Sequence, residues 1–308
     1  MATRMTLAAE AQGGELLRTS GLRDFWRLCK PNVMQLVIFT SAVAVYLAPG
    51  HVHALLDLTA LICIALGAAA SAAINNSFDA DIDVRMARTR LRPTASGRID
   101  AAEALAVGVT LAIISVMLMG LALNWLSAAL LALTIAFYVF VYTMWLKRRT
   151  PQNIVIGGAA GALPPVVAWA AVTGQVTLLP LLMFAIIFLW TPPHFWALAL
   201  YRTGDYDRVG VPMLPVVAGR RSTLRHILGY TVVLVAVTLL PAAFGLAGPI
   251  YGASALALGA VFVAYAVRLW WHDRDVLAMR TFRYSIIYLF LLFGAFALDR
   301  ALQNLVHG

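Results

Sequence analysis

Nine long runs of apolar residues dominate this sequence, and most are close to the roughly 20 residues that a membrane-spanning helix needs, the first being short. They lie at Val33–Tyr46, Leu56–Ile74, Ala101–Leu123, Trp125–Leu146, Ile154–Val172, Leu178–Leu200, Ile227–Phe244, Tyr251–Leu269 and Tyr284–Leu298. A membrane β-barrel is excluded, since its strands alternate in polarity over about 10 residues. Hydrophobic residues make up 62% of the chain and charged residues 12%, against about 45–50% and about 25% in soluble domains. We predict an all-α, polytopic protein of nine transmembrane helices.

The basic residues predict the orientation of these spans. Nine spans place the termini on opposite sides of the bilayer, and loops rich in Lys and Arg stay cytoplasmic. With the N-terminus in the cytoplasm, every basic residue except Arg300 falls in an inner segment. The net charge of +9 therefore reflects topology, and we expect no nucleic-acid partner. We expect residues 1–32 to form a cytoplasmic N-terminal segment and residues 33–304 a single intramembrane domain.

The N-terminal segment also bears on the membrane concerned. Transit peptides of mitochondria are poor in acidic residues, whereas this segment contains Glu10, Glu15 and Asp24. We therefore expect a bacterial cell inner membrane, with the mitochondrial inner membrane as the alternative.

Two long inner loops, after the second and sixth spans, match each other at a constant offset of 122 residues. Asp83, Pro93, Gly97 and Arg98 correspond to Asp205, Pro215, Gly219 and Arg220. The match indicates an internal repeat of about four helices, which is a common membrane architecture. Such a repeat would bring the two acidic loops together on the cytoplasmic face.

The second span ends with a regular series of oxygen-bearing side chains. On a helix turning about 100° per residue, Asn75, Asp79 and Asp83 fall within one narrow arc, and Asp81 points elsewhere. A hydrated helix end is the simplest interpretation of acidic residues at an interface. The constant four-residue spacing instead favours a cation site, because amide and carboxylate oxygens suit Mg²⁺. Asp205 in the second loop is the candidate ligand of a second Mg²⁺.

Basic residues accompany these carboxylates on the inner loops. They are Arg85, Arg88, Arg90 and Arg92 after the second span and Lys147, Arg148 and Arg149 after the fourth. Inner-loop basic residues are expected from topology alone, but a guanidinium also binds phosphate oxygens in a bidentate manner. Carboxylates that hold Mg²⁺ beside such cations form a site for a diphosphate, which Mg²⁺ would stabilise as a leaving group. Asp79, Asp83 and Asp205 are thus the candidate catalytic residues.

The fifth and sixth spans carry features that indicate a central cavity. Pro164–Pro165 and Pro192–Pro193 interrupt helical hydrogen bonding, which the membrane tolerates beside a cavity or neighbouring helices. His194 is the one ionisable residue well inside a predicted span. Such residues are candidates for function, although a neutral histidine bonded to a neighbouring helix is the alternative.

Several motifs resemble one enzyme family. They are Asn75-x-x-x-Asp79-x-x-x-Asp83 with Arg88-Thr89-Arg90 and Arg92-Pro93, Leu146-Lys147-Arg148 followed by Asn153 to Gly158, Thr191-Pro192-Pro193-His194-Phe195-Trp196, and Asp205-Tyr206 followed by Gly210 to Pro215. The first motif resembles the intramembrane UbiA-type prenyltransferases, and the combination resembles their protoheme IX farnesyltransferase branch. The resemblance runs from about Lys30 to the last span. Two positions depart from the family pattern: Val209 replaces a second aspartate, and Asn32 stands where a basic residue is frequent.

The resemblance implies a UbiA-like fold around a central cavity and a Mg²⁺-dependent reaction. Farnesyl diphosphate would alkylate the vinyl group of heme B. Asn75, Asp79, Asp83 and Asp205 would hold the metal, and His194 would lie beside the porphyrin. The residues on the diphosphate would be Arg88, Arg90, Arg92, Lys147 and Arg148. A membrane enzyme that handles heme is an expected partner. The alternatives are a prenyltransferase with an aromatic quinone-precursor acceptor and, from another class, a membrane transporter.

Overall fold

The computed structural model describes residues 21–50 and 53–307, and within these residues the chain is helical, without strands. Its helices are α2 (Leu22–Leu28), α3 (Pro31–Leu47), α4 (Ala54–Phe78), α5 (Ala80–Asp83), α6 (Ala101–Ala122), α7 (Trp125–Ala136), the π-helix η1 (Phe137–Leu146), α8 (Asn153–Ala162), α9 (Pro164–Thr173), α10 (Leu178–Tyr201), α11 (Thr203–Arg208), α12 (Leu214–Val217), α13 (Gly219–Ala243), α14 (Pro249–His272) and α15 (Asp275–His307). Residues 1–20 of the predicted N-terminal segment lie outside the described residues.

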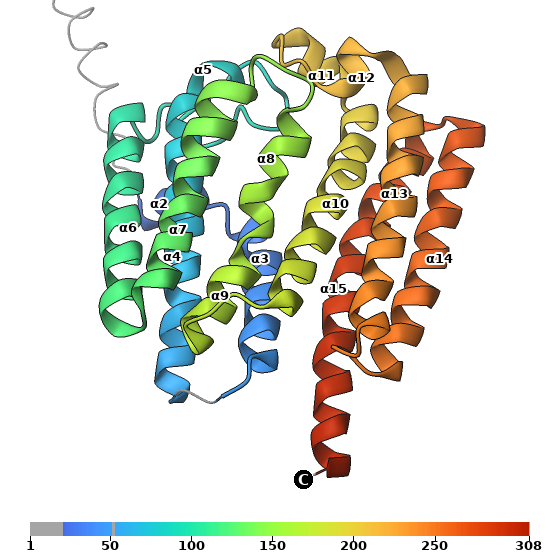
Figure 1. The fold of residues 1–308 in the computed structure, drawn as a ribbon. Helices are drawn as coiled ribbons and strands as arrows, with labels where there is room; N and C mark the ends of the chain where they lie inside the picture. The colour runs from blue at the N-terminus through green and yellow to red at the C-terminus, as the bar shows by residue number, and fades with distance from the viewer. Residues whose placement is uncertain (1–20, 51–52, 308) are drawn as a thin grey trace, which may run out of the picture.

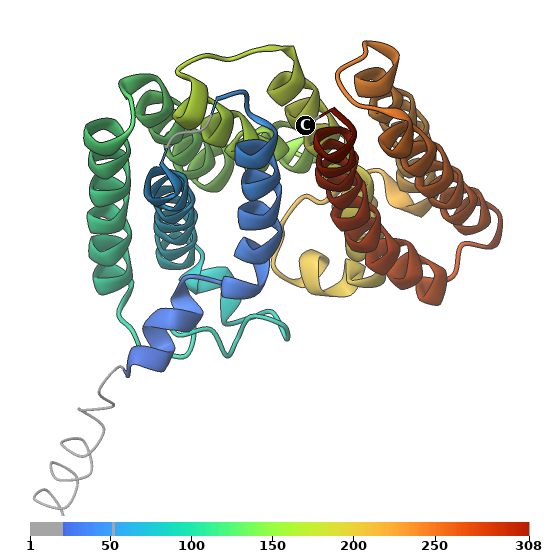
Figure 2. The ribbon, with the colours of Figure 1, turned by 90° about the horizontal axis from the view of Figure 1, so that it is seen from below.

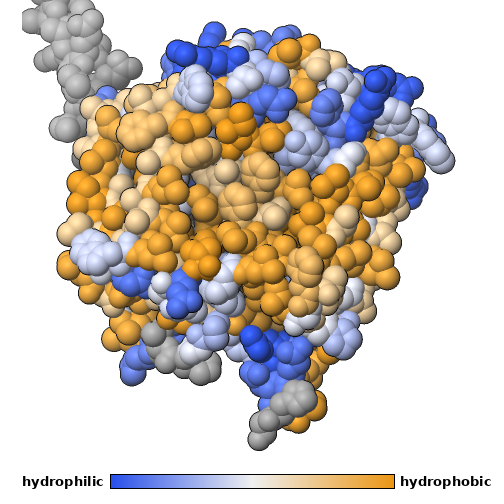
Figure 3. Space-filling view, in the orientation of Figure 1, coloured by the Kyte–Doolittle hydropathy of each residue, from blue (hydrophilic) through white to orange (hydrophobic). Residues whose placement is uncertain are grey.

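The helices confirm a multi-pass membrane protein. Within the described ranges, eight helical stretches are long and apolar enough to span a bilayer, with η1 continuing α7 and α9 continuing α8, and the number becomes nine if the bent pair α2–α3 counts as one span. The long helices run side by side, and the short helices α5, α11 and α12 lie together at one end of the bundle (Figure 1). A broad apolar belt surrounds the middle of the visible face, and hydrophilic residues gather at its two ends (Figure 3). This is the distribution that a bilayer requires.

The predicted repeat is visible in the order of packing. In the first half α4 packs on α6 and α6 on α7, and in the second half α10 packs on α13 and α13 on α14. The two halves lie on opposite sides of the bundle seen from below, with α3 facing α15 between them (Figure 2). Phe39 and Phe290 join these two helices, with ring centroids 4.4 Å apart.

Several predicted spans have different boundaries in the structure. The first is a 17-residue helix, α3, that meets α2 at an angle of 57°. The seventh and ninth spans are longer than predicted. Helix α13 begins at Gly219, eight residues before the predicted start, and α15 begins at Asp275, nine residues before it. Both extensions carry arginines. The long aliphatic part of an arginine side chain can lie along the helix while its charged group stays in water. Hydropathy detects only the apolar part of such a helix.

Prolines and a change of helix type modify the spans that border the site. At Pro164 the fifth span breaks into α8 and α9, as predicted, whereas α10 continues as one helix through Pro192 and Pro193. The fourth span changes from α to π geometry over Phe137–Leu146. There the Lys147 amide bonds the Tyr142 carbonyl, five residues back, at 2.9 Å. Such wider turns are often found at functional sites.

Candidate active site

The predicted polar series ends α4 and is buried. Asn75, Asp79 and Asp83 are 3%, 0% and 2% exposed, so the interpretation as a hydrated helix end is wrong. Asp79 ends α4, yet its carbonyl still accepts a hydrogen bond from the Asp83 amide at 2.8 Å. The helical path therefore continues across the break into α5. Because buried carboxylates need charged or hydrogen-bonding partners, the surroundings of these two decide what the site can do.

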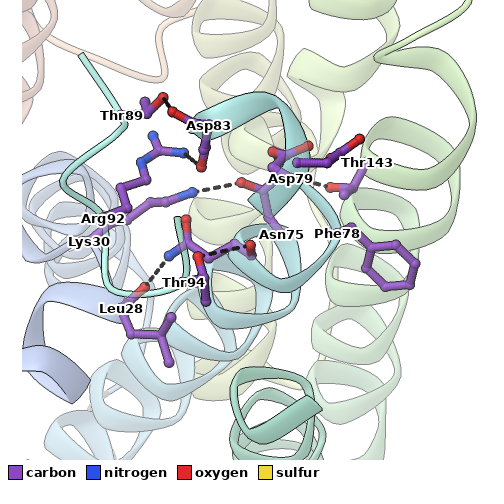
Figure 4. Close-up of polar contacts among 12 residues, drawn as sticks. Leu28, Lys30, Asn75, Phe78, Asp79, Asp83, Thr89, Arg92, Thr94 and Thr143 are labelled. Carbon is purple, nitrogen blue, oxygen red and sulfur yellow. Dashed lines mark hydrogen bonds and ion pairs between the residues drawn. The ribbon is translucent and has the colours of Figure 1, made fainter. Parts of the chain in front are cut away.

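Cations contact both carboxylates. Lys147, just after η1, forms an ion pair with Oδ2 of Asp79, and Arg92 donates to Oδ2 of Asp83 at 2.6 Å. Lys30 donates to Oδ1 of Asn75 at 2.6 Å, and Nδ2 of Asn75 donates to Asp79 at 2.7 Å. Figure 4 shows Lys30 and Arg92 side by side, pointing toward Asn75 and Asp83. The result is a small, mixed-charge cluster at the hydrophilic end of the bundle.

One oxygen in this cluster has no hydrogen-bond partner among the described residues. Oδ1 of Asp79 is buried and accepts no hydrogen bond from the described residues, and the nearest guanidinium nitrogen, from Arg148, is 4.0 Å away. Leaving a buried charged acceptor unsatisfied is costly. The free oxygen is therefore available to a cation.

The donor set fits Mg²⁺. The described residues contain no group of three or more His, Cys, Asp or Glu side chains placed to hold a metal by themselves. Mg²⁺ does not require one, since it usually takes one or two carboxylates and completes its shell with water and substrate phosphates. Asp79 and Asp83, with the amide of Asn75, supply that smaller set.

Lys30 is the site residue that sequence reasoning missed. Its backbone adopts a left-handed conformation, φ 53°, at the bend between α2 and α3, and Pro31 then starts α3 in a position suited to proline. This bend brings Lys30 to Asn75, 45 positions later in the chain. A signal was present in the composition, because Lys30 and Lys147 are the two lysines of the chain and every other basic residue is arginine.

The arginines predicted to contact phosphate occupy different environments. Arg88 and Arg90 are exposed and form no ion pair with a described residue, while Arg92 is engaged by Asp83. Arg148 holds Asp81 in a bidentate pair at 2.8 and 2.7 Å and also donates to the Phe78 carbonyl. Hydrogen bonding to Arg148 lowers the pKa of Asp81 below its ordinary value. Asp81 thus points away from Asp79, as predicted. Through Arg148, it links the end of α4 to the loop after η1.

Asp205 lies in the second loop and does not join Asp79 and Asp83 in a cluster of three carboxylates. It is half-buried and lies 3.8 Å from Arg202 and 3.8 Å from Arg208. The two acidic loops do meet, through an apolar contact. Its residues are Ile82 and Met86 from the first loop and Val209, Val211 and Met213 from the second. The two loops therefore lie together, as expected, and Tyr206, next to Asp205, packs against this contact.

An apolar cavity of about 160 Å³ begins beside Lys30 and extends into the bundle. Lys30 and Tyr138 line it near the polar cluster, and Ile64, Leu131 and Val167 are among the residues that line it elsewhere. Because Lys30 both borders the cavity and bonds Asn75, the charged and apolar parts form one site.

His194 lies in α10 and forms no ion pair with a carboxylate of the described residues. It is 8% exposed, and its Nδ1 is 2.7 Å from Oγ of Ser285 on α15. Trp190 stacks on the ring with centroids 4.2 Å apart. The interhelical hydrogen bond that was the alternative prediction for this histidine is therefore present. Any second role of the side chain depends on its other ring nitrogen, Nε2.

Comparison with known proteins agrees with this geometry. Residues 36–296 match the model of the UbiA prenyltransferase family. Proteins named protoheme IX farnesyltransferase from Parvibaculum lavamentivorans and Acidiphilium cryptum are each 55% identical to the chain, over 96% and 90% of it and 93% and 90% of their own lengths.

Solved structures share the fold at low identity. A digeranylgeranylglyceryl phosphate synthase superposes with a TM-score of 0.76 at 19% identity, covering 90% of this chain and 98% of that one. A UbiA homologue from Archaeoglobus fulgidus bound to GPP and Mg²⁺ gives 0.56 at 17% identity, covering 89% and 99%. Since the family model spans most of the chain and relatives more than half identical align over nearly all of it, the chain belongs to the UbiA prenyltransferase family.

Proposed function

We propose that this chain transfers the farnesyl group of farnesyl diphosphate to a vinyl group of heme B, in a Mg²⁺-dependent reaction. The carbon–oxygen bond of the diphosphate breaks, a carbon–carbon bond forms at the vinyl group, and water adds to give the hydroxyethylfarnesyl chain of heme O and free diphosphate. The observation that carries the proposal is the buried oxygen of Asp79 that accepts no hydrogen bond, in a cluster of cations that Lys30 joins to an apolar cavity. The names of the relatives supply the acceptor.

The carboxylates and the amide would hold the metal. Asp79 offers its free Oδ1, with Asp83 and Asn75 beside it, and Asp205 of the adjoining loop is the candidate ligand of a second ion. When bound, Mg²⁺ would supply the positive charge that stabilises the diphosphate leaving group. Metal at these carboxylates would also replace the charge that Lys147 and Arg92 now provide to them. Those two cations would then be available to phosphate oxygens.

The remaining cations would complete the diphosphate site. Arg88 and Arg90 are exposed and unpaired in the described structure, so they can turn toward a ligand without losing an ion pair. Arg148 lies 4.0 Å from Asp79 and retains its bond to Asp81. We add Lys30 to this set, because its ammonium lies between Asn75 and the cavity.

The apolar cavity suits the prenyl chain. Moving fifteen carbons out of water is worth on the order of 10 kcal/mol at about 0.8 kcal/mol per carbon, so a diphosphate bound at the polar cluster would direct its chain into this cavity. Walls of aliphatic side chains would also keep water from the allylic cation before it meets the acceptor. His194 would lie beside the porphyrin on the α10 side of the protein.

The distribution of charge supports an orientation in the membrane. The basic loops and the short helices α5, α11 and α12 share one end of the bundle, whereas the last turns of α15 reach the other (Figure 1). By the positive-inside rule, the active site and the N-terminus face the cytoplasm of a bacterial inner membrane. Residues 33–304 act as one catalytic domain, and an enzyme that supplies heme B or consumes heme O is the expected partner.

A direct assay tests the proposal. Purified protein in lipid is incubated with heme B, farnesyl diphosphate and Mg²⁺, and the extracted porphyrin is analysed by mass spectrometry. We expect a gain of one hydroxyfarnesyl unit, lost on omission of Mg²⁺ and reduced by at least about 100-fold in Asp79→Asn. Asp57→Asn is the matched control, since Asp57 lies on the same helix at the opposite end.

The assay separates three results. Unchanged porphyrin with Asp79-dependent consumption of farnesyl diphosphate would support the diphosphate site and replace heme with another acceptor, such as an aromatic quinone precursor. Full activity of Asp79→Asn would reject the proposed metal site. Absence of both reactions in folded protein would reject the proposed function.

A further inference from the structure

His194 lies between aromatic rings contributed by α10 and α15. Trp190 stacks on the imidazole at a centroid distance of 4.2 Å, and Phe282 lies 4.6 Å away, tilted by 31°. Phe195 approaches at 5.0 Å with its ring nearly perpendicular. Because the stacked rings cover the faces of the imidazole, its polar contacts are made through the ring edge, at Nδ1 and Nε2.

The hydrogen bonds of Ser285 determine which nitrogen carries the proton. Oγ of Ser285 is 2.6 Å from the Phe282 carbonyl oxygen and 2.7 Å from Nδ1 of His194. Two oxygens this close share a proton, and a serine hydroxyl has only one to give. The Ser285 proton therefore goes to the carbonyl, and the hydroxyl must accept from Nδ1 of His194.

The other nitrogen is then an electron-pair donor. His194 forms no ion pair with a carboxylate in the described chain, and a buried imidazolium without a counter-charge is costly, so the ring is neutral. In a neutral imidazole with the proton on Nδ1, Nε2 carries the free lone pair. Nε2 has no hydrogen-bond partner among the described residues, and the side chain keeps 8% of its surface exposed.

Ser285 is itself held firmly. Its side chain is fully buried, and its carbonyl accepts a hydrogen bond from the Trp190 indole at 2.7 Å. The same indole stacks on His194. Trp190, His194 and Ser285 therefore form a closed set that fixes the orientation of the imidazole as well as its tautomer.

We propose that Ser285 is a positioning residue that presents Nε2 of His194 to an electron-pair acceptor, the iron of the porphyrin substrate. This inference rests on the proposed function. Histidines that bind metals commonly donate their other ring N–H to a hydrogen-bond acceptor, which fixes the tautomer and the ring orientation. Ser285 occupies that supporting position, and it would hold the heme for alkylation without touching it.

The test measures heme binding spectroscopically. Heme B is titrated into purified wild-type protein and into His194→Ala, Ser285→Ala and Ser285→Thr, and the absorption bands of ferric and ferrous heme are recorded with the dissociation constants. We expect His194→Ala to lose the spectrum of histidine-bound heme. Ser285→Ala should weaken heme binding about 10- to 100-fold and alter the bands, and Ser285→Thr, which keeps the hydroxyl, should restore both.

Ser115→Ala is the matched control. Ser115 is also fully buried and donates to the carbonyl three residues back, Ala112, at 2.9 Å, but it contacts no histidine. Wild-type spectra and affinity in Ser285→Ala would overturn the positioning role. An unchanged spectrum in His194→Ala, with heme still farnesylated, would overturn iron ligation while leaving the proposed function intact. If wild-type protein neither binds nor modifies heme, the proposed function fails and this inference fails with it.

Discussion

Lys30 and Asp79 are joined through one side chain, since Asn75 accepts a hydrogen bond from the lysine at 2.6 Å and donates one to the aspartate at 2.7 Å. The amide is oriented by both partners, because only its oxygen can accept and only its nitrogen can donate. An aspartate at position 75 would lose the donor, and a leucine would lose both. The bend before α3 and the end of α4 are thereby fixed relative to each other.

Asn75→Leu should therefore lower both stability and turnover. The substitution leaves Lys30 without its acceptor and Asp79 without one donor, which costs about 1–3 kcal/mol for buried groups. Thermal unfolding and the porphyrin assay measure the two effects. Asn124→Leu is the control: Asn124 caps α7 and bonds the Ala170 carbonyl at the other end of the membrane, so its loss should lower stability and spare turnover per folded molecule. Wild-type turnover in Asn75→Leu would contradict the proposed role of the amide.

The two lysines allow a chemical test of diphosphate binding. Reductive methylation modifies amines but not arginine, so Lys30, Lys147 and the terminal amine are the groups that can react in this chain. We expect farnesyl diphosphate with Mg²⁺ to slow the modification of both lysines at least about tenfold, because phosphate oxygens would occupy them. Peptide mass spectrometry reads each position, with the terminal amine as internal control. Equal rates with and without ligand would place the diphosphate elsewhere.

Gly161→Phe should change the preferred length of the prenyl chain. Gly161 lines the apolar cavity, and a Cβ added there meets no atom within 4 Å, so we expect a larger side chain there to occupy part of the cavity. Turnover with geranyl diphosphate relative to farnesyl diphosphate should rise by about tenfold, the scale of discrimination that pocket size provides.

Gly67 provides the contrast for that variant. It lines the same cavity, but an added Cβ would lie 2.8 Å from Cδ1 of Leu131, so Gly67→Ala should mainly destabilise the protein. An unchanged substrate ratio in folded Gly161→Phe would mean that the prenyl chain lies outside the cavity.

Acid should weaken the attachment of α4 to the loop after η1. Hydrogen bonding to Arg148 lowers the pKa of Asp81 in the folded protein, so this pair stabilises the fold above the ordinary carboxyl pKa and the contribution is lost as the pH falls through the lowered value. The Asp81 side chain is 61% exposed, which limits the effect to about 1 kcal/mol or less. Unfolding temperatures between pH 7 and pH 3 should show a smaller acid-side decrease in Asp81→Asn than in wild type. Parallel curves would show that the pair contributes nothing.

Hydropathy and charge predicted the membrane architecture because both act locally. Apolar runs located the spans, the basic loops lie together at one end, and the repeat between Asp83 and Asp205 corresponds to two similarly packed halves. The boundaries of α13 and α15 were wrong where arginines extend a helix beyond the apolar stretch.

Contacts between distant segments lay beyond such reasoning. Helical periodicity placed Asn75, Asp79 and Asp83 on one face, but it did not show that the chain would bury them against Lys30 and Arg92. Nor did it separate Arg148, which is committed to Asp81, from the exposed Arg88 and Arg90. The contact of Ser285 could not be predicted for the same reason, because its partner His194 lies 91 positions earlier.

The π-helix η1 makes the active site sensitive to chain length rather than only to side-chain identity. Thr143 lies within it and Lys147 directly after it, and they contact Asn75 and Asp79. The i→i+5 hydrogen bonds of η1 close wider turns than those of an α-helix, so the direction of Lys147 depends on both the length and the geometry of this segment. A change of helix type there would alter the direction of Lys147 relative to Asp79 while leaving both residues in the sequence.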